Sequence, residues 1–69
     1  MISPDDLQAR LQKWADTFQN RNRAAEVLSA ELECALGTAR AYIDYRLPRA
    51  TYGDAYRVWQ FLSQQPEWM

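Results

Sequence analysis

The side chains that could act in catalysis are few in this sequence and poorly placed for it. Histidine is absent, which removes the commonest metal ligand and the one side chain that titrates near neutral pH without help. Glu31 and Glu33 stand two residues apart, so on a helix they face different directions and form no carboxylate pair. Ser29 and Ser63 have no base beside them. The single Cys34 is of a residue type that is more often buried as a small apolar group than used as a thiol.

The sequence also lacks the features that form a ligand pocket. Its two glycines, Gly37 and Gly53, are far apart and follow no expected strand, so no glycine-rich phosphate loop is present. A chain of 69 residues has little area with which to enclose a pocket of the usual volume of about 300 Å³ or more. We therefore expect no enzyme activity, no cofactor, no metal and no small-molecule substrate.

Aromatic residues and arginines offer a different chemistry, that of binding. Seven of the nine aromatic residues lie in the last 28 positions, interleaved with three arginines. Tyr, Trp and Arg dominate binding hot spots because each combines a large contact area with a polar group. The alternative, an aromatic core buried within a monomer, carries comparable weight. The candidate partner-binding residues are Tyr45, Arg46, Arg49, Tyr52, Tyr56, Arg57 and Trp59.

A first helix is expected from about residue 4 to residue 19. Ser3 can cap free amides and Pro4 suits the first helical position. Gln8 and Gln12 fall on the face that we expect to be solvated. The apolar stripe has spacings of four, three and four residues, as a helix requires, and consists of Leu7, Leu11, Trp14 and Phe18.

A second helix is expected from about residue 22 to residue 46, with a break at Gly37 left open. Its apolar positions recur every three or four residues without interruption, and Pro48 disfavours helical geometry at Leu47. Glycine inside a helix costs about 1 kcal/mol relative to alanine, which is less than one buried leucine contributes. We therefore prefer one continuous helix. The stripe consists of Ala25, Leu28, Leu32, Leu36, Ala39, Ile43 and Leu47.

A last helix is expected over residues 53 to 65, where Thr51 and Asp54 form a plausible cap. It is apolar over most of its circumference, so it has more apolar surface than two neighbouring helices can cover. No strand alternation, repeat or low-complexity tract is present. The sequence thus predicts an all-α fold, a small bundle of three main helices in one domain, residues 1–69.

Residues 31–44 resemble the helix-turn-helix of phage repressor and Cro proteins. In that motif a glycine at the ninth position permits the turn, and Gly37 matches it. Apolar residues at the fourth, eighth and fifteenth positions pack the two helices together, and these are Leu32, Leu36 and Ile43. The resemblance implies that the segment enters the major groove of DNA.

The same resemblance implies roles for particular side chains. Thr38 would cap the recognition helix, and Arg40, Ala41, Asp44 and Tyr45 would face the groove. Three features depart from the pattern: the fifth position, usually alanine, is Glu33, the eighteenth, usually apolar, is Arg46, and Asp44 would bring a negative charge to the phosphates. The net charge of −1 also offers little attraction to phosphates. DNA binding through Thr38, Arg40 and Tyr45 is therefore the second choice.

Two shorter segments are similar to the Hha family of small helical proteins, which bind nucleoid proteins and modulate transcription. The segments are Asp44-Tyr45-Arg46-Leu47 and Val58-Trp59-Gln60-Phe61-Leu62. The likeness implies binding to a protein partner.

The absence of a basic start followed by an apolar run predicts no signal peptide, and no apolar run is long enough for a membrane span. One cysteine allows no internal disulfide. We expect a small cytoplasmic regulatory protein of the size and type that phages and mobile elements encode. It would act by binding a protein partner or itself as a homodimer, or alternatively as a helix-turn-helix DNA-binding regulator.

Overall fold

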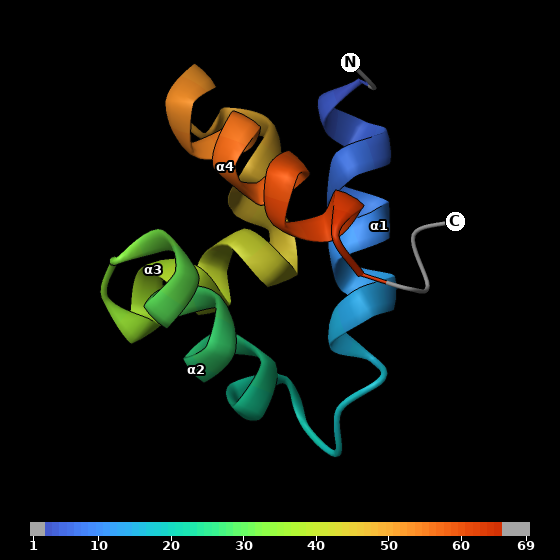
Figure 1. Cartoon of the computed structure of the whole chain (residues 1–69), viewed down its shortest axis with the longest axis vertical. Coiled ribbons are helices and arrows are strands. Elements are labelled where there is room, and N and C mark those ends of the chain that lie inside the picture. The colour runs from blue at the N-terminus through green and yellow to red at the C-terminus, as the bar shows by residue number, and fades with distance from the viewer. Residues whose placement is uncertain (1–2, 66–69) are drawn as a thin grey trace.

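A computed structural model describes residues 3–65, and every regular element within that range is helical. The four α-helices are α1 (Pro4–Ala15), α2 (Arg21–Leu32), α3 (Leu36–Ala41) and α4 (Tyr52–Ser63), as Figure 1 shows. A π-helical turn (Tyr42–Arg46) and a 3-10 turn (Leu47–Arg49) continue directly from α3. The all-α prediction is confirmed, with four helices where three main ones were expected.

Helix α1 begins as predicted and ends earlier. The Ser3 hydroxyl accepts the Asp6 amide at 3.2 Å, and Pro4 occupies the first turn. The helix was expected to reach residue 19 but ends at Ala15. There the amides of Thr17 and Phe18 donate to carbonyls three residues back, which tightens the chain into the turn leading to α2.

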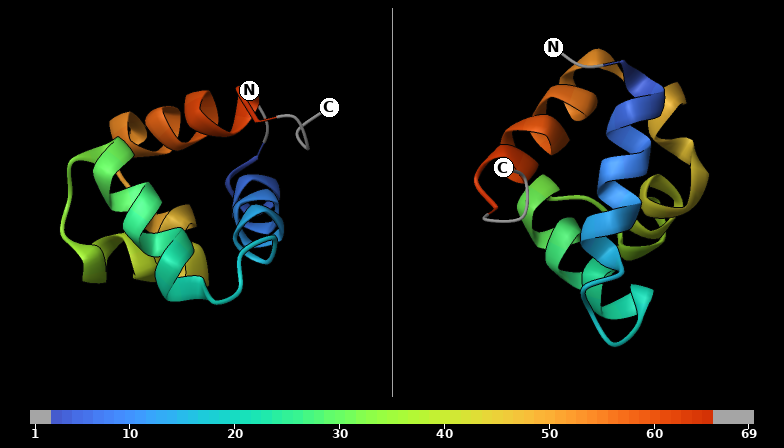
Figure 2. Two further views of the ribbon diagram at one scale, coloured as in Figure 1. Left: turned by 60° about the horizontal axis from the view of Figure 1, so that its bottom comes forward. Right: turned by 90° about the vertical axis from the view of Figure 1, so that its right-hand side faces the viewer.

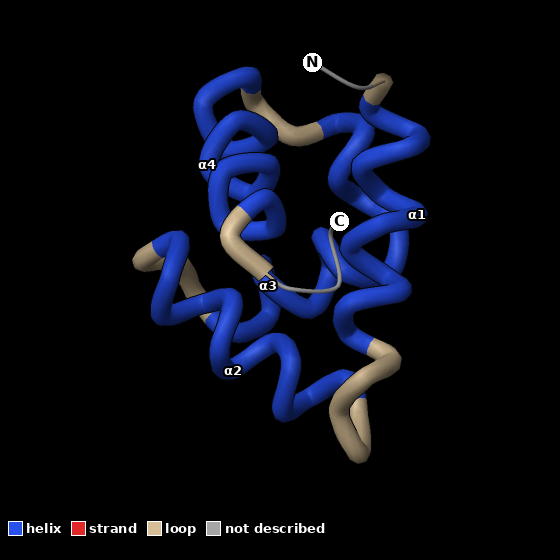
Figure 3. The backbone as a smooth tube through the Cα atoms, turned by 45° about the vertical axis from the view of Figure 1, so that its right-hand side comes forward, coloured by secondary structure: helices blue, strands red, loops and turns tan. Residues whose placement is uncertain are grey.

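The central segment breaks at Glu33, and not at Gly37. Glu33 has the left-handed conformation (φ 53, ψ 45), and the Cys34 amide donates to the carbonyl of Ser29 at 3.1 Å. Gly37 is helical within α3. The continuous helix over 22–46 and the break at Gly37 are both wrong, since the chain turns one helical turn earlier (Figure 3).

Burial explains why the chain turns there. A left-handed conformation costs a residue with a side chain about 1 to 2 kcal/mol. Turning at Glu33 folds α2 and α3 against each other and buries Leu32 and Ala39 between them. It also places Leu36 outside the core, and 48% of the surface of Leu36 is exposed. Burial of a large apolar side chain contributes roughly 1.5 to 3 kcal/mol, which offsets the local strain.

The chain stays helical through Pro48, contrary to the expected end at Leu47. Leu47 has helical angles (φ −57, ψ −39), and the 3-10 turn ends at Arg49. Proline has no N–H to give to a carbonyl four residues back. The side chain of Gln12 donates to that carbonyl, Asp44 O, at 2.9 Å. Side chains of α1 thus replace backbone donors that the turn lacks.

Helix α4 starts at a confirmed cap, with the Thr51 hydroxyl accepting the Asp54 amide at 3.2 Å. It contacts both α1 and α2 and so closes the bundle (Figure 2). Val58 and Leu62 are its buried residues. No helix within residues 3–65 has the length and apolar character to cross a membrane. The core contains Leu7, Leu11, Trp14, Leu28, Ile43, Leu47, Val58 and Leu62, among others.

Candidate functional site

Helices α2 and α3 and the turn between them form the first candidate surface. Leu28 and Leu32 of α2 are buried, and so are Ala39 and Tyr42 in and directly after α3. The turn consists of Glu33–Ala35 and joins α2 to α3, which pack on each other. One side of this unit faces the core, and the other begins with the exposed Leu36.

A cluster of charged side chains lies at the junction of these helices. The Oδ1 of Asp44 pairs with Arg21 NH1 at 3.0 Å, and its Oδ2 pairs with Arg40 Nε at 3.0 Å. Arg40 NH1 also donates to the side-chain oxygen of Asn22. Arg21 NH2 lies 3.5 Å from the Asp16 carboxylate. Three elements therefore meet here: the end of α1, the first turn of α2, and α3 with its π-helical extension.

The electrostatics of the cluster favour the charged form of Arg21. The hydrogen bond that Arg21 donates to Asp44 is the largest cause that raises the pKa of the Arg21 guanidinium, and the charges of Asp16 and Asp44 raise it further. The Asp44 side chain keeps about a third of its surface exposed, at 32%, and Arg40 keeps 40%. The cluster is accordingly a surface feature that solvent and ligands can reach.

The predicted DNA-binding residues fall in different environments. Thr38 is half-buried inside α3 and does not cap it, because α3 begins at Leu36 with Ala35 at the cap and no side-chain cap bond. Arg40 lies in the charged cluster. Tyr45 is 71% exposed on the π-helical turn. Sequence reasoning missed Arg21 and Asn22, and no spacing signal links them to Arg40, which is 18 residues from Asn22.

The second candidate surface is on α4. Tyr52 is 77% exposed and Tyr56 is 41% exposed. The ring of Tyr56 lies 5.9 Å from that of Trp59, which is half-buried against the core. Gln60 donates to the Tyr56 hydroxyl at 3.4 Å. These rings are partly held in place while Tyr52 projects from the first turn of the helix.

The predicted arginines differ in role. Arg57 is exposed but donates to the carbonyl of Leu32 at 3.3 Å, so it satisfies the end of α2. Arg46 and Arg49 are exposed on the π-helical and 3-10 turns. No ion pair within residues 3–65 involves either of these two. The seven predicted partner-binding residues thus lie on consecutive segments, and the rings of Tyr56 and Trp59 are paired.

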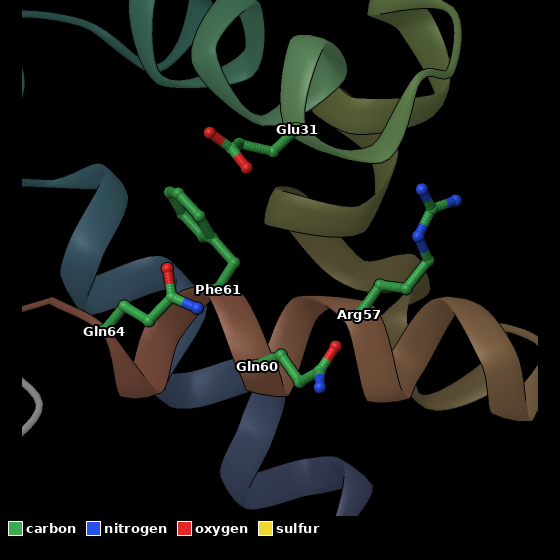
Figure 4. Close-up of a pocket in the computed structure, with 5 residues that line it drawn as sticks. All are labelled: Glu31, Arg57, Gln60, Phe61 and Gln64. Carbon is green, nitrogen blue, oxygen red and sulfur yellow. The ribbon is translucent and has the colours of Figure 1, made fainter.

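A shallow hollow of about 140 Å³ separates the end of α2 from α4 (Figure 4). Its volume is below the roughly 300 Å³ of typical ligand sites. Figure 4 shows Glu31 reaching into it from α2, opposite side chains of α4. The lining residues are Glu31, Arg57, Gln60, Phe61 and Gln64.

Asp54 of α4 contributes to the raised pKa values of two side chains. Burial, followed by the charge of Asp54, raises the pKa of the Cys34 thiol above its ordinary value. Burial also raises the pKa of Tyr42, whose hydroxyl donates to Asp54 Oδ2 at 2.8 Å. Both groups are structural in this arrangement. Within the described range, no three side chains are grouped as metal ligands.

No family model, curated protein or solved structure matches this chain. The resemblances to the Cro-type motif and to the Hha family therefore stay predictions that rest on the residues alone.

Proposed function

We propose that this chain is a small DNA-binding regulator that uses α2, the turn and α3 as a helix-turn-helix. The observation that carries the proposal is the left-handed turn at Glu33 between two helices packed on each other. The Cro-type pattern places its turn at the ninth position. With Glu33 at that position, the motif runs from Ala25 to Asp44, four residues earlier than the sequence suggested.

This register agrees better with the packing. Leu28 and Leu32 take the fourth and eighth positions, Ala39 the fifteenth, and all three are buried. The small Ser29 takes the fifth position, where the helices cross closely, and the buried Tyr42 takes the eighteenth. In this register Glu33 and Arg46 no longer occupy the fifth and eighteenth positions of the pattern.

The exposed face supplies groups for a duplex. Leu36 and Gly37 are exposed at the start of α3, and Arg40 follows one turn later. Arg23 is exposed in the first turn of α2, the end of a helix that favours phosphates. Exposed Arg46 and Arg49 extend the basic groups beyond α3. We expect weak, strongly salt-dependent affinity, because few phosphates are neutralised.

The test is fluorescence anisotropy with labelled 20-base-pair duplexes, first random and then selected from a random pool. The wild type should bind more weakly as salt rises from roughly 50 to 200 mM. Arg40→Ala should weaken binding while the circular dichroism spectrum stays unchanged. Lys13→Ala, an equal loss of charge on the exposed face of α1, should bind like the wild type. A wild type with no salt-sensitive binding contradicts the proposal.

Protein binding through α4 is the second candidate, and the exposure of Tyr52 and Tyr56 favours it. A second copy of the chain is the simplest partner, since proteins that bind DNA through this motif act as dimers. The two candidates are compatible, because one uses α2 and α3 and the other α4. Together they describe a cytoplasmic, non-enzymatic regulator of the kind expected from phages or mobile elements.

A further inference from the structure

We propose that Asp44 is a built-in competitor for phosphate groups, which holds Arg21 and Arg40 away from a nucleic-acid backbone and so weakens binding to unspecific duplexes. The inference rests on the proposed function and adds a regulating residue to it. From the sequence, Asp44 was expected to bring a negative charge to the phosphates, but its pairing with Arg21 and Arg40 was not expected.

Each oxygen of the Asp44 carboxylate binds one of the two arginines. Oδ1 accepts from Arg21 NH1 and Oδ2 accepts from Arg40 Nε, each at 3.0 Å. These contacts are charge-assisted hydrogen bonds, which are stronger than those between neutral groups. The two arginines come from different helices, so one carboxylate controls both.

One further nitrogen of each arginine is also engaged by the protein. Arg40 NH1 donates to Asn22, and Arg21 NH2 lies 3.5 Å from Asp16. A phosphate must therefore displace Asp44 before it can accept from Arg40 Nε. Asp44 and its two arginine partners each keep about a third or more of their side-chain surface exposed. The exposed fraction is 36% for Arg21, 40% for Arg40 and 32% for Asp44. Displacement by a ligand from solvent is thus sterically open.

Asp44→Asn is the most direct change. The amide has the shape of the carboxylate, but only one of its two atoms accepts hydrogen bonds. One arginine then faces an amide donor and is released, and the local negative charge is lost. The variant should bind a random 20-base-pair duplex roughly fivefold more tightly at low salt, with a salt slope steeper by about 0.9 for each arginine that gains a phosphate.

Asp5→Asn is the matched control. It removes the same charge from the exposed first turn of α1. At a rise of about 1.5 Å per residue, Asp5 is about 16 Å along α1 from Asp16, which contacts Arg21. Its duplex affinity should stay within about twofold of the wild type, since a single distant charge is screened. An equal gain for Asp5→Asn would overturn the inference, because a general charge effect would then suffice.

Two further variants separate the mechanism from a loss of folding. Asp44→Ser removes the carboxylate without introducing an amide and should also bind more tightly, and thermal melts followed by circular dichroism report the fold of each variant. Asp44→Asn combined with Arg40→Gln restores the net charge of the wild type. The double variant should lose most of the gain of Asp44→Asn, and keeping all of it would count against the role of Arg40.

The outcomes distinguish the inference from the proposed function. If the wild type binds duplexes and neither Asp44 variant binds more tightly, the inference is wrong and the function stands. If the wild type fails to bind while both Asp44 variants bind, the competitor role is supported and DNA binding by the unaltered chain is not. If no form binds, both are overturned.

Discussion

The side chain of Gln8 on α1 forms a hydrogen bond with the backbone of Leu47, which lies 39 residues later in the chain. Gln8 Oε1 accepts the Leu47 amide at 2.9 Å. Its Nε2 donates to the carbonyls of Tyr42 and Ile43 at 2.7 and 2.8 Å. Gln8 thereby makes three of the hydrogen bonds that attach the segment after α3 to α1, beside the one from Gln12 to Asp44, which makes Gln8 a sensitive point of the fold.

Gln8→Ala should destabilise the protein by about 2 kcal/mol. Each lost hydrogen bond contributes roughly 0.5 to 1.5 kcal/mol, and the carbonyls left behind are partly buried. The free energy of unfolding from urea titration measures the effect. Gln19→Ala, in the exposed turn after α1, should change it by less than about 0.5 kcal/mol. Similar values for the two variants would mean that the Gln8 bonds contribute nothing net.

Glu33→Gly should stabilise the protein by about 1 kcal/mol. Glu33 is the one non-glycine residue with positive φ among residues 3–65, and glycine adopts that conformation without the steric penalty. Thermal unfolding measures the gain. Glu33→Ala removes the same charge but keeps the penalty, so it should give no such gain. A destabilised Glu33→Gly variant would contradict the account of the turn.

Gly37→Ala should also stabilise, by about 0.5 to 1 kcal/mol. Gly37 is helical, and a Cβ built on it meets no atom within 4 Å, so the substitution gains helix propensity without a clash. This result separates the two positions for the turn, since a turn at Gly37 would make alanine destabilising there. Urea titration again gives the sign.

Leu36→Ser should leave stability within about 0.5 kcal/mol of the wild type, because Leu36 is about half exposed. Leu32→Ala, four residues earlier on the predicted stripe, should cost about 2 to 5 kcal/mol, because Leu32 is 4% exposed. Denaturation midpoints compare the two. Equal losses would place both residues in one continuous apolar stripe.

Tyr52→Ser and Tyr56→Ser should shift the chain toward the monomer if α4 carries the second-copy interface. Exposed aromatic rings contribute disproportionately to such contacts. Sedimentation velocity over a concentration series gives the dissociation constant, which should rise roughly tenfold or more for each variant. Tyr45→Ser, with an equally exposed ring on the π-helical turn, is the control. A wild type that stays monomeric throughout the series refutes the α4 interface.

The helix starts and most core positions were predictable because they depend on local chemistry. Ser3 and Thr51 cap the helices expected of them, and the stripe residues Leu28, Ala39 and Ile43 are buried. Periodicity could not place the break. The apolar residues on either side of Glu33 keep the spacing of three and four residues that a continuous helix would have. The position of the turn was decided by packing of α2 on α3, which no local signal contains.

Long-range polar contacts were beyond the same reasoning. Gln8 and Gln12 were expected to face solvent because glutamine on an apolar helix usually does. Their partners are backbone groups more than thirty residues away. The pairing of Arg21 with Asp44 joins residues 23 apart, and only the folded backbone brings them together. Arg40, Tyr52 and Tyr56, which the sequence offered as candidates, are at least partly exposed, whereas the pairing of Asp44 with both arginines was not expected.

The attachment of the π-helical turn to α1 has a kinetic consequence. Its bonds to Gln8 close loops of 34 to 39 residues, about half of the chain, whereas α2 and α3 contact each other locally. Long loops close late because their entropy must be lost before the contact is gained. During synthesis, α1 emerges from the ribosome before the segment after α3, so the side-chain amides of Gln8 and Gln12 are without these partners until that segment follows. We expect the segment after α3 to become ordered only when the nascent chain has emerged far enough to reach back to Gln8.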